Sequence, residues 1–216
     1  HAQTETEAME ARRLAEFLLP VCKAYGSETG FDVANMAIQI LGGHGYVSDA
    51  GVEQHVRDVR VAAIYEGSNG IQALDLVSRK LIKDSGARYQ LLVKRFELDI
   101  LESADFNEVD DIRNTLKDGM VILQDCSSYL LDDGRSRLDI ESGATDYLQL
   151  VGLLAGAWMS LRIAVAVLKN RKELQKLDFA KYYCQDLMPK AMLFQKRIKI
   201  GAGVLDDITK ETLLEW

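Results

Sequence analysis

The sequence has 216 residues, of which 48% are hydrophobic and 27% charged, and this composition is typical of a globular protein with a real core. Its net charge of −7 and its pI of about 5.1 disfavour binding to phosphate backbones, so we expect no nucleic-acid partner. The sequence contains two prolines, and because proline breaks helices this scarcity predicts an all-α fold with long helices.

The cysteines and the N-terminus argue against a disulfide-rich protein, a zinc protein and a signal peptide. Cys22, Cys126 and Cys184 are far apart and form no CxxC pair or Cys/His cluster. We therefore expect three buried free thiols in a reducing compartment, with no disulfide framework and no metal site. The first residues lack the basic and apolar regions of a signal peptide, and they lack an initiator Met. We expect the chain to be a piece of a longer protein.

The first part of the chain predicts four helices, over residues 5–25, 33–41, 52–59 and 71–82. Apolar residues recur at helical spacing in the first and the last of these segments. We expect Pro20 to kink the first helix, Gly26 to end it and Asp32 to cap the second. A glycine cluster over residues 42–45 ends the second helix, and residues 66–70 form a turn.

Beyond Gly86 the sequence predicts further helices, over residues 87–101, from an acidic segment at 102–111 to residue 131, over 146–175 and over 179–200. We therefore divide the chain into residues 1–86 and 87–216. The amphipathic stripes of both parts need cover, so we expect residues 87–216 to pack against residues 5–82 in one globular unit.

Two stretches of the second part need a separate interpretation. Residues 148–168 are about as long as a membrane span. They contain Arg162 and many small residues, however, which predicts a buried core helix instead of a transmembrane helix. The basic residues of 190–199 are interpreted as a solvated helix face.

Two loops carry candidate functional residues, at Gln39–Tyr46 and at Tyr65–Gly70. Taken alone, each has an ordinary structural explanation. Glycines that follow a helix are usually C-caps, and a glutamate in a turn is usually an exposed carboxylate. The two loops together, within one ordered run of sequence, form a far more specific motif than either loop alone.

Residues 35–81 read NMAIQILGGHGYVSDAGVEQHVRDVRVAAIYEGSNGIQALDLVSRKL. This run closely resembles the C-terminal signature of the acyl-CoA dehydrogenases, in which a helix ending in QxLGGxGY is followed by VE, RDxR and IYEGTxxIQ. The resemblance is strong over residues 5–82, whereas residues 87–216 more loosely resemble the extra helical domain of longer family members. It implies an all-α helical bundle with a C-terminal helical extension.

The resemblance also implies roles for individual residues. Glu66 matches the catalytic base that removes the α-proton of an acyl-CoA while the β-hydride passes to FAD. Gly67 matches a position that touches the thioester end of the substrate. The matched cofactor contacts are Ser68, Asn69 and Gly70 at the flavin, and Gln39, Gly42 and Gly43 at the adenylate end on a neighbouring subunit. Ser68 stands where threonine is more usual and keeps its hydroxyl group.

Partners and location follow from the same resemblance. It implies an acyl-CoA substrate, an electron-transfer flavoprotein as electron acceptor, a homo-oligomer, and a location in the bacterial cytoplasm or the mitochondrial matrix. The family's N-terminal helical domain and middle β-domain are not in this sequence, so we expect the chain alone to be inactive. The alternative is a non-catalytic helical assembly module that keeps the family packing, and the retained Glu66 argues against it. Arg57 and Asp58 are expected to form a structural ion pair, and His44 to be an ordinary loop residue.

Overall fold

The computed structural model describes residues 4–203 and residue 208. Within that part of the chain every regular element is a helix, so the predicted all-α fold is confirmed. The longer helices are α1 (Glu5–Leu41), α3 (Val52–Arg60), α5 (Ala87–Glu102), α6 (Asp110–Leu130), α7 (Arg137–Asn170) and α9 (Lys190–Ile200). The shorter helices are α2 (Gly43–Tyr46), α4 (Asn69–Leu74) and α8 (Gln175–Tyr182), with π-helical turns over Asp75–Ile82 and Tyr183–Leu187 and 3₁₀ turns over Ser48–Ala50, Val61–Ala63 and Asn107–Val109.

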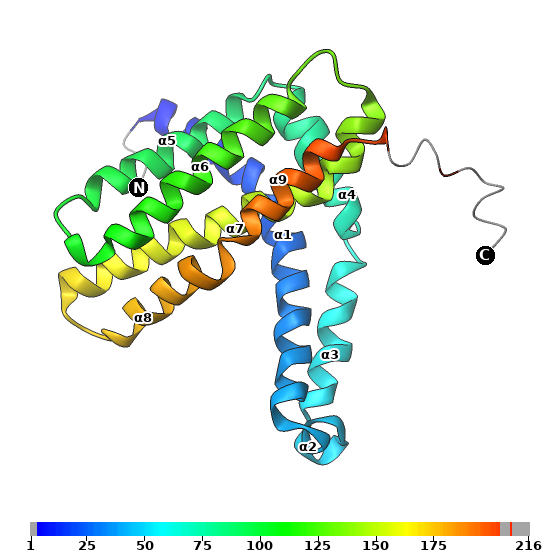
Figure 1. Ribbon diagram of the computed structural model, residues 1–216, viewed down its shortest axis with the longest axis vertical. Helices are drawn as coiled ribbons and strands as arrows, with labels where there is room; N and C mark the ends of the chain where they lie inside the picture. The colour runs from blue at the N-terminus through cyan, green and yellow to red at the C-terminus, as the bar shows by residue number, and fades with distance from the viewer. Residues whose placement is uncertain (1–3, 204–207, 209–216) are drawn as a thin grey trace.

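The helices form a body and an arm (Figure 1). The body contains α5 to α9 together with the N-terminal half of α1. The C-terminal half of α1 leaves this body, α2 turns the chain at the far end, and α3 returns alongside α1. We call residues 30–60 the arm, with its tip at α2 and its base where α3 leads to α4.

Helix α1 is continuous, so the predicted break between residues 25 and 33 is wrong. Gly26 does not end the helix, and Asp32 lies inside it instead of capping a new one. Gly30 has a packing role, because a Cβ atom placed there would lie 3.0 Å from Cγ2 of Val59. The small residue lets α3 approach α1 closely. The predicted end of the helix is correct, because α1 stops at Leu41 before a Gly42 with φ of 59°.

The second half of the chain departs from prediction at two helix boundaries. Helix α7 begins at Arg137, earlier than residue 146, because Ser136 and Asp139 form a capping box there. The single helix predicted over 179–200 is divided into α8, a π-helical turn and α9, with the division at Met188 and Pro189. Proline lacks a backbone N–H, which favours a new helix start at this point.

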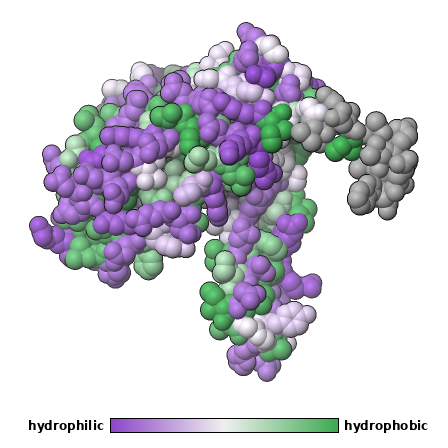
Figure 2. All heavy atoms as spheres, viewed as in Figure 1, coloured by the Kyte–Doolittle hydropathy of each residue, from purple (hydrophilic) through white to green (hydrophobic). Residues whose placement is uncertain are grey.

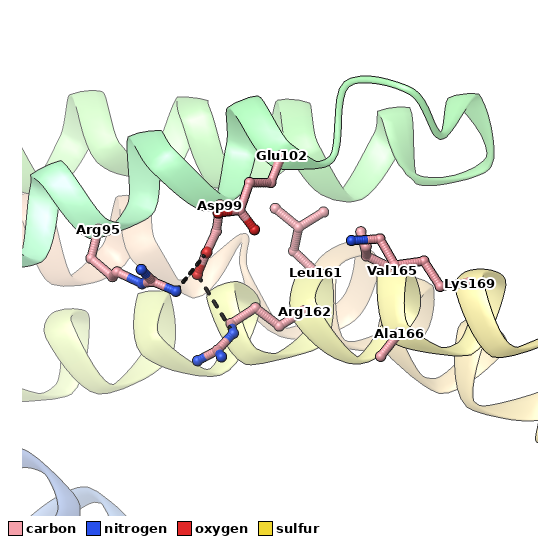
Figure 3. Close-up of a pocket in the computed structure, with 8 residues that line it drawn as sticks. All are labelled: Arg95, Asp99, Glu102, Leu161, Arg162, Val165, Ala166 and Lys169. Atoms are coloured by element: carbon pink, nitrogen blue, oxygen red, sulfur yellow. Dashed lines mark ion pairs between the residues drawn. The ribbon is translucent and has the colours of Figure 1, made fainter. Parts of the chain in front are cut away.

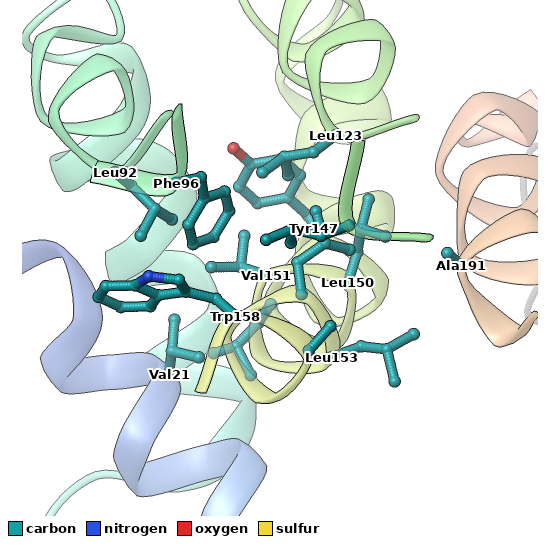
Figure 4. Close-up of a cluster of buried hydrophobic side chains, with 14 of the residues drawn as sticks. Val21, Leu92, Phe96, Leu123, Tyr147, Leu150, Val151, Leu153, Trp158 and Ala191 are labelled. Carbon is teal, nitrogen blue, oxygen red and sulfur yellow. The ribbon is translucent and has the colours of Figure 1, made fainter. Parts of the chain in front are cut away.

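Side chains from both sequence segments share one hydrophobic core, as expected. Val21 of α1, Leu92 of α5 and Val151 of α7 are each at most 3% exposed, and they meet in the cluster drawn in Figure 4. The rings of Phe96 and Trp158 pack at a tilt within this cluster, with centroids 5.3 Å apart. The boundary between two domains near residue 86 stays a prediction.

Helix α7 is the centre of this core. It is the one helix within the described residues that is long and apolar enough to cross a membrane, with a mean hydropathy of 1.9 in its most apolar window. However, 67% of that window is buried against other helices. A core helix shows this burial, in agreement with the interpretation of residues 148–168 made from the sequence.

The exposure of the cysteines and of the basic residues of α9 can be compared with the predictions from the sequence. Cys126 and Cys184 are buried as expected, but Cys22 is exposed, so the prediction of three buried thiols is wrong for that residue. Cys22 lies on the outer side of α1, between inward-facing Val21 and Ala24. The basic residues of α9 are exposed, as predicted.

Candidate active site

The two groups of candidate residues lie at opposite ends of the arm. Gln39, Gly42 and Gly43 lie at its tip, whereas Glu66 to Gly70 follow α3 at its base. We call residues 65–70 the base loop, because they lie at the base of the arm. The base loop contacts Lys23 of α1. About 24 Å of helix, at about 1.5 Å per residue, separate Lys23 from Gln39. The two groups therefore cannot contact the same part of one ligand.

The base loop has an unusual backbone at two consecutive residues. Glu66 has φ of 54° and Gly67 has φ of 86°, so both lie in the left-handed region. Glycine adopts this region freely, whereas a residue with a side chain carries a strain of about 1–3 kcal/mol there. The surrounding contacts must hold Glu66 in this conformation.

Two side chains hold the backbone of the loop directly. Gln72 of α4 donates a hydrogen bond from Nε2 to the carbonyl oxygen of Glu66 at 3.1 Å. Lys23 of α1 donates from Nζ to the carbonyl oxygen of Gly67 at 2.7 Å. A larger residue at position 67 would displace this donor, because a Cβ atom there would lie 3.0 Å from Nε2 of Gln72.

The side chain of Asn69 fixes the loop to α1. Its Oδ1 accepts a hydrogen bond from Nζ of Lys23 at 2.9 Å, and its Nδ2 lies 3.0 Å from Oγ of Ser27 and 3.1 Å from Oε1 of Glu28. These bonds occupy the amide group of Asn69. A cofactor contact by Asn69 would therefore use its backbone.

The remaining groups of the loop point outward. The side chains of Glu66 and Ser68 are exposed, and Ser68 makes no capping hydrogen bond to α4. Three apolar residues beside them are also largely exposed: Ile64 at 61%, Tyr65 at 51% and Ile71 at 57%. A carboxylate on an apolar surface becomes dry when that surface is covered, which is the environment a base for C–H chemistry needs.

The tip of the arm presents open backbone. No atom lies within 4 Å of a Cβ placed at Gly42 or Gly43, and both residues are exposed together with Gln39. Gly45 is different, because a Cβ there would lie 2.8 Å from Cβ of Leu41, so its size is set by packing. The N–H of Gly42 donates to the carbonyl oxygen of Gln39 at 3.3 Å, so the exposed backbone of Gly43 and the side chain of Gln39 are the groups that can meet a polar ligand here.

Exposed apolar side chains also gather along the arm. They are Val33, Met36, Ile40, Leu41, Tyr46 and Val47. Figure 2 shows hydrophobic side chains on the visible face of this region. A groove of about 660 Å³ lies between the arm and the body and is lined in part by Met36, Leu153 and Phe194. So much exposed apolar surface is typical of a protein interface.

Asp58 and His44 are two further polar residues of the arm. Asp58 accepts a hydrogen bond from Nε2 of Gln54 at 2.6 Å, and no ion pair between Arg57 and Asp58 forms within the residues that the structure describes, so that expectation is wrong. His44 is exposed, as expected, but it lies within the short helix α2 instead of a loop.

A polar cavity of about 150 Å³ between α5 and α7 is also explained by packing (Figure 3). Asp99 is 6% exposed and receives a hydrogen bond from Nε1 of Trp158 at 2.5 Å. Arg95 and Arg162 form ion pairs with the same carboxylate at 3.1 and 3.5 Å. The cations that line the cavity therefore balance a buried charge.

Sequence reasoning missed the residues that anchor the loop, namely Lys23, Ser27, Glu28 and, through Glu28, Gln149 of α7. Lys23 and Ser27 share one face of α1, which is a weak local signal. Their partners lie more than 40 residues further along the chain, so no spacing rule connects them.

Fold and loop together define an all-helical protein that presents a carboxylate on a strained loop beside one shared hydrophobic core. Residues 2–81 match the family described as acyl-CoA dehydrogenase, C-terminal domain, and residues 92–208 match the family described as acetyl-CoA dehydrogenase C-terminal like. The chain belongs to the acyl-CoA dehydrogenase family.

Individual relatives agree with this assignment. The chain is 31% identical over 180 residues to the 3-methylmercaptopropionyl-CoA dehydrogenase of Ruegeria pomeroyi, which covers 82% of this chain and 30% of the relative. It is 28% identical over 172 residues to the broad-specificity linear acyl-CoA dehydrogenase FadE5 of Mycobacterium tuberculosis, covering 75% of this chain and 28% of the relative. The mitochondrial isobutyryl-CoA dehydrogenase of Bos taurus is 39% identical over 79 residues, covering 37% of this chain and 19% of the relative. The chain thus spans less than a third of the length of these relatives.

Proposed function

We propose that this chain forms the C-terminal part of a flavoenzyme that dehydrogenates an acyl-CoA thioester between its α- and β-carbons, with Glu66 as the base. The observation that carries the proposal is the conformation of the base loop. The backbone of Glu66 is held in the left-handed region by Gln72, and the backbone of Gly67 by Lys23, while the Glu66 carboxylate points outward. A side chain held in this way is positioned for a partner outside the chain.

The proposed chemistry follows from the residues of this loop. A carboxylate oxygen of Glu66 takes the α-proton of the thioester, and its apolar neighbours Ile64, Tyr65 and Ile71 exclude water once the rest of the enzyme covers them. We assign Gly67, the next residue, to the thioester end of the substrate. FAD, when bound, accepts the hydride that leaves the β-carbon.

The exposed groups fit a flavin dinucleotide shared between subunits. At the base of the arm the hydroxyl of Ser68 makes no capping bond and Gly70 is exposed, and Asn69 would contribute its backbone. At the tip the side chain of Gln39 and the backbone of Gly43 are exposed, and Gly42 is exposed although its N–H donates to the carbonyl oxygen of Gln39. Because about 24 Å of helix separate the two groups, we propose that they serve different FAD molecules. The apolar surface of the arm supports a homo-oligomer in which the tip reaches a neighbouring copy.

The same proposal sets the partners and the location. An acyl-CoA dehydrogenase must return its electrons to an acceptor, and we propose an electron-transfer flavoprotein for this role. We place the enzyme in the bacterial cytoplasm or the mitochondrial matrix. We also expect this chain alone to be inactive, because a ligand that loses most of its polar contacts, worth about 1.5–3 kcal/mol each, loses most of its affinity.

The test uses the complete enzyme, in which this chain is joined to the missing domains. We expect Glu66→Gln to lower steady-state turnover at least about 100-fold while the purified enzyme keeps its full content of FAD. Glu97→Gln, at an exposed position of α5, is the matched control and should leave turnover unchanged. A non-catalytic assembly module predicts the opposite result, with no effect of Glu66→Gln on the function of the complete protein.

A further inference from the structure

We propose that Gln149 of the C-terminal helical extension is a positioning residue for the loop that carries Glu66. The inference rests on the proposed function of that loop. It assigns to the extension a part in the reaction, through a polar bridge that we define as Asn69, Glu28 and Gln149.

The bridge is a continuous series of hydrogen bonds across three elements. At one end, Nδ2 of Asn69, at the start of α4, donates to Oε1 of Glu28 on α1 at 3.1 Å. At the other end, Nε2 of Gln149 on α7 donates to Oε2 of the same carboxylate. Each oxygen of Glu28 therefore has its own donor, and the two donors come from two different helices, α4 and α7.

The bridge connects the loop to the buried centre of the hydrophobic core. Gln149 stands between Leu148 and Leu150, which are 1% and 0% exposed in the centre of the core. Asn69 in turn binds Nζ of Lys23, which holds the carbonyl oxygen of Gly67. A displacement of Glu28 would thus be transmitted to the residue that follows Glu66.

The electrostatics of the bridge favour this role. Hydrogen bonds to a charged group are stronger than those between neutral groups, and both Asn69 and Gln149 donate to a carboxylate. All three residues of the bridge are half-buried, which limits screening by solvent. Without Gln149, one oxygen of Glu28 would lose its donor, and the carboxylate could rotate away from Asn69.

Two variants of Gln149 separate the bridge from simple packing. Gln149→Met keeps the length of the side chain but removes the donor. Gln149→Glu keeps its shape but replaces the donor by a carboxylate that repels Glu28. If the bridge positions the loop, both variants should have the same effect. Gln124→Met, at an exposed position on α6, is the matched control.

The first measurement is hydrogen exchange of this chain, which needs no enzymatic activity. We expect exchange in the peptide over residues 64–74 to become about three- to tenfold faster in both Gln149 variants, with no change in α6. Unchanged exchange in this peptide, or equal acceleration across the whole chain, would overturn the proposal.

The second measurement is the kinetics of the complete enzyme. We expect kcat to fall about tenfold in the Gln149 variants with KM nearly unchanged, because the loss lies in the position of the base. A loosened loop with unchanged kcat would overturn the positioning role. If the unmodified complete enzyme has no dehydrogenase activity, the proposed function fails, while the exchange result still decides whether the bridge orders the loop.

Discussion

The ammonium group of Lys23 lies 2.7 Å from the carbonyl oxygen of Gly67 and 2.9 Å from Oδ1 of Asn69. One cation from the middle of α1 thereby holds two points of a loop that lies 44 residues further along the chain. The loop carries its candidate base outward because its inward side is occupied by these contacts.

Removal of the cation should loosen the loop. We expect Lys23→Met to lower the free energy of unfolding of this chain by about 1–2 kcal/mol, because two hydrogen bonds to a partly buried charged group are lost. Denaturant unfolding of the purified chain measures the change. Lys83→Met, at an exposed lysine after the π-helical turn, is the control and should have little effect. Equal losses in the two variants would show that the contacts of Lys23 are not special.

A second prediction concerns the backbone of the loop. We expect Gly67→Ala to destabilise the chain by about 1–3 kcal/mol, because alanine is strained at positive φ and its Cβ would press on Gln72. Gly70→Ala is the matched control, since a Cβ there meets no atom within 4 Å. It should be neutral or slightly stabilising, because alanine favours helix. Thermal unfolding of both variants decides the matter, and a tolerated Gly67→Ala would contradict the observed conformation.

The cysteines should differ in reactivity. Burial raises the pKa of the Cys126 thiol to about 12 and that of the Cys184 thiol to about 11, so both stay protonated and inert at neutral pH. Cys22 is exposed and accessible to reagents. We expect alkylation of the native chain to label Cys22 alone, and all three cysteines after unfolding, as read by intact mass. Rapid native labelling of Cys126 or Cys184 would contradict the burial.

A fourth prediction is a pH dependence of stability at the start of α7. The backbone N–H of Ala202 and the hydroxyl of Ser136 donate to Asp139, and these bonds lower the pKa of its carboxyl. The folded state therefore binds this proton less tightly than the unfolded state. The stabilisation is present above about pH 4, the unfolded pKa of Asp, and is lost as the pH falls through the lower folded pKa.

The variant that tests this dependence is Asp139→Asn. It should be less stable than the parent chain at neutral pH, and the difference should shrink as the pH falls below about 4. Asp133→Asn, at an exposed position of the preceding turn, should show no such trend. Thermal midpoints across the pH range supply the comparison, and a difference that grows toward acid would reverse the predicted sign.

The sequence predicted helices best where the signals are local. The start of α5 after Gly86, the end of α6 near residue 131 and the stop at Gly201 all depend on residues next to the boundary. Gly26 misled the prediction because a glycine inside a helix reads as a stop, whereas α1 continues through it. Gly30, also inside α1, serves contact with Val59. The start of α7 was readable, since Ser136 and Asp139 have the spacing of a capping box.

In the candidate site, too, the residues of a local motif could be predicted and their distant contacts could not. Glu66 and its neighbours form one short motif, so a resemblance of sequence could identify them. Their supports could not be found in this manner, because Lys23 and Gln149 meet the loop only after α1 and α7 have packed. The amide of Asn69 is another example, since the motif suggests a cofactor contact and the fold uses the side chain to anchor the loop.

The central claim is that Glu66 removes the α-proton, and anaerobic single-turnover reduction of FAD tests it most directly. The complete enzyme is mixed with an acyl-CoA in the absence of an acceptor, and loss of the visible flavin absorbance reports the chemical step. We expect Glu66→Gln to bind FAD and the thioester normally but to reduce the flavin at least about 100-fold more slowly than the unmodified enzyme. Reduction in the variant at more than about a tenth of the normal rate would contradict the assignment of Glu66 as the base.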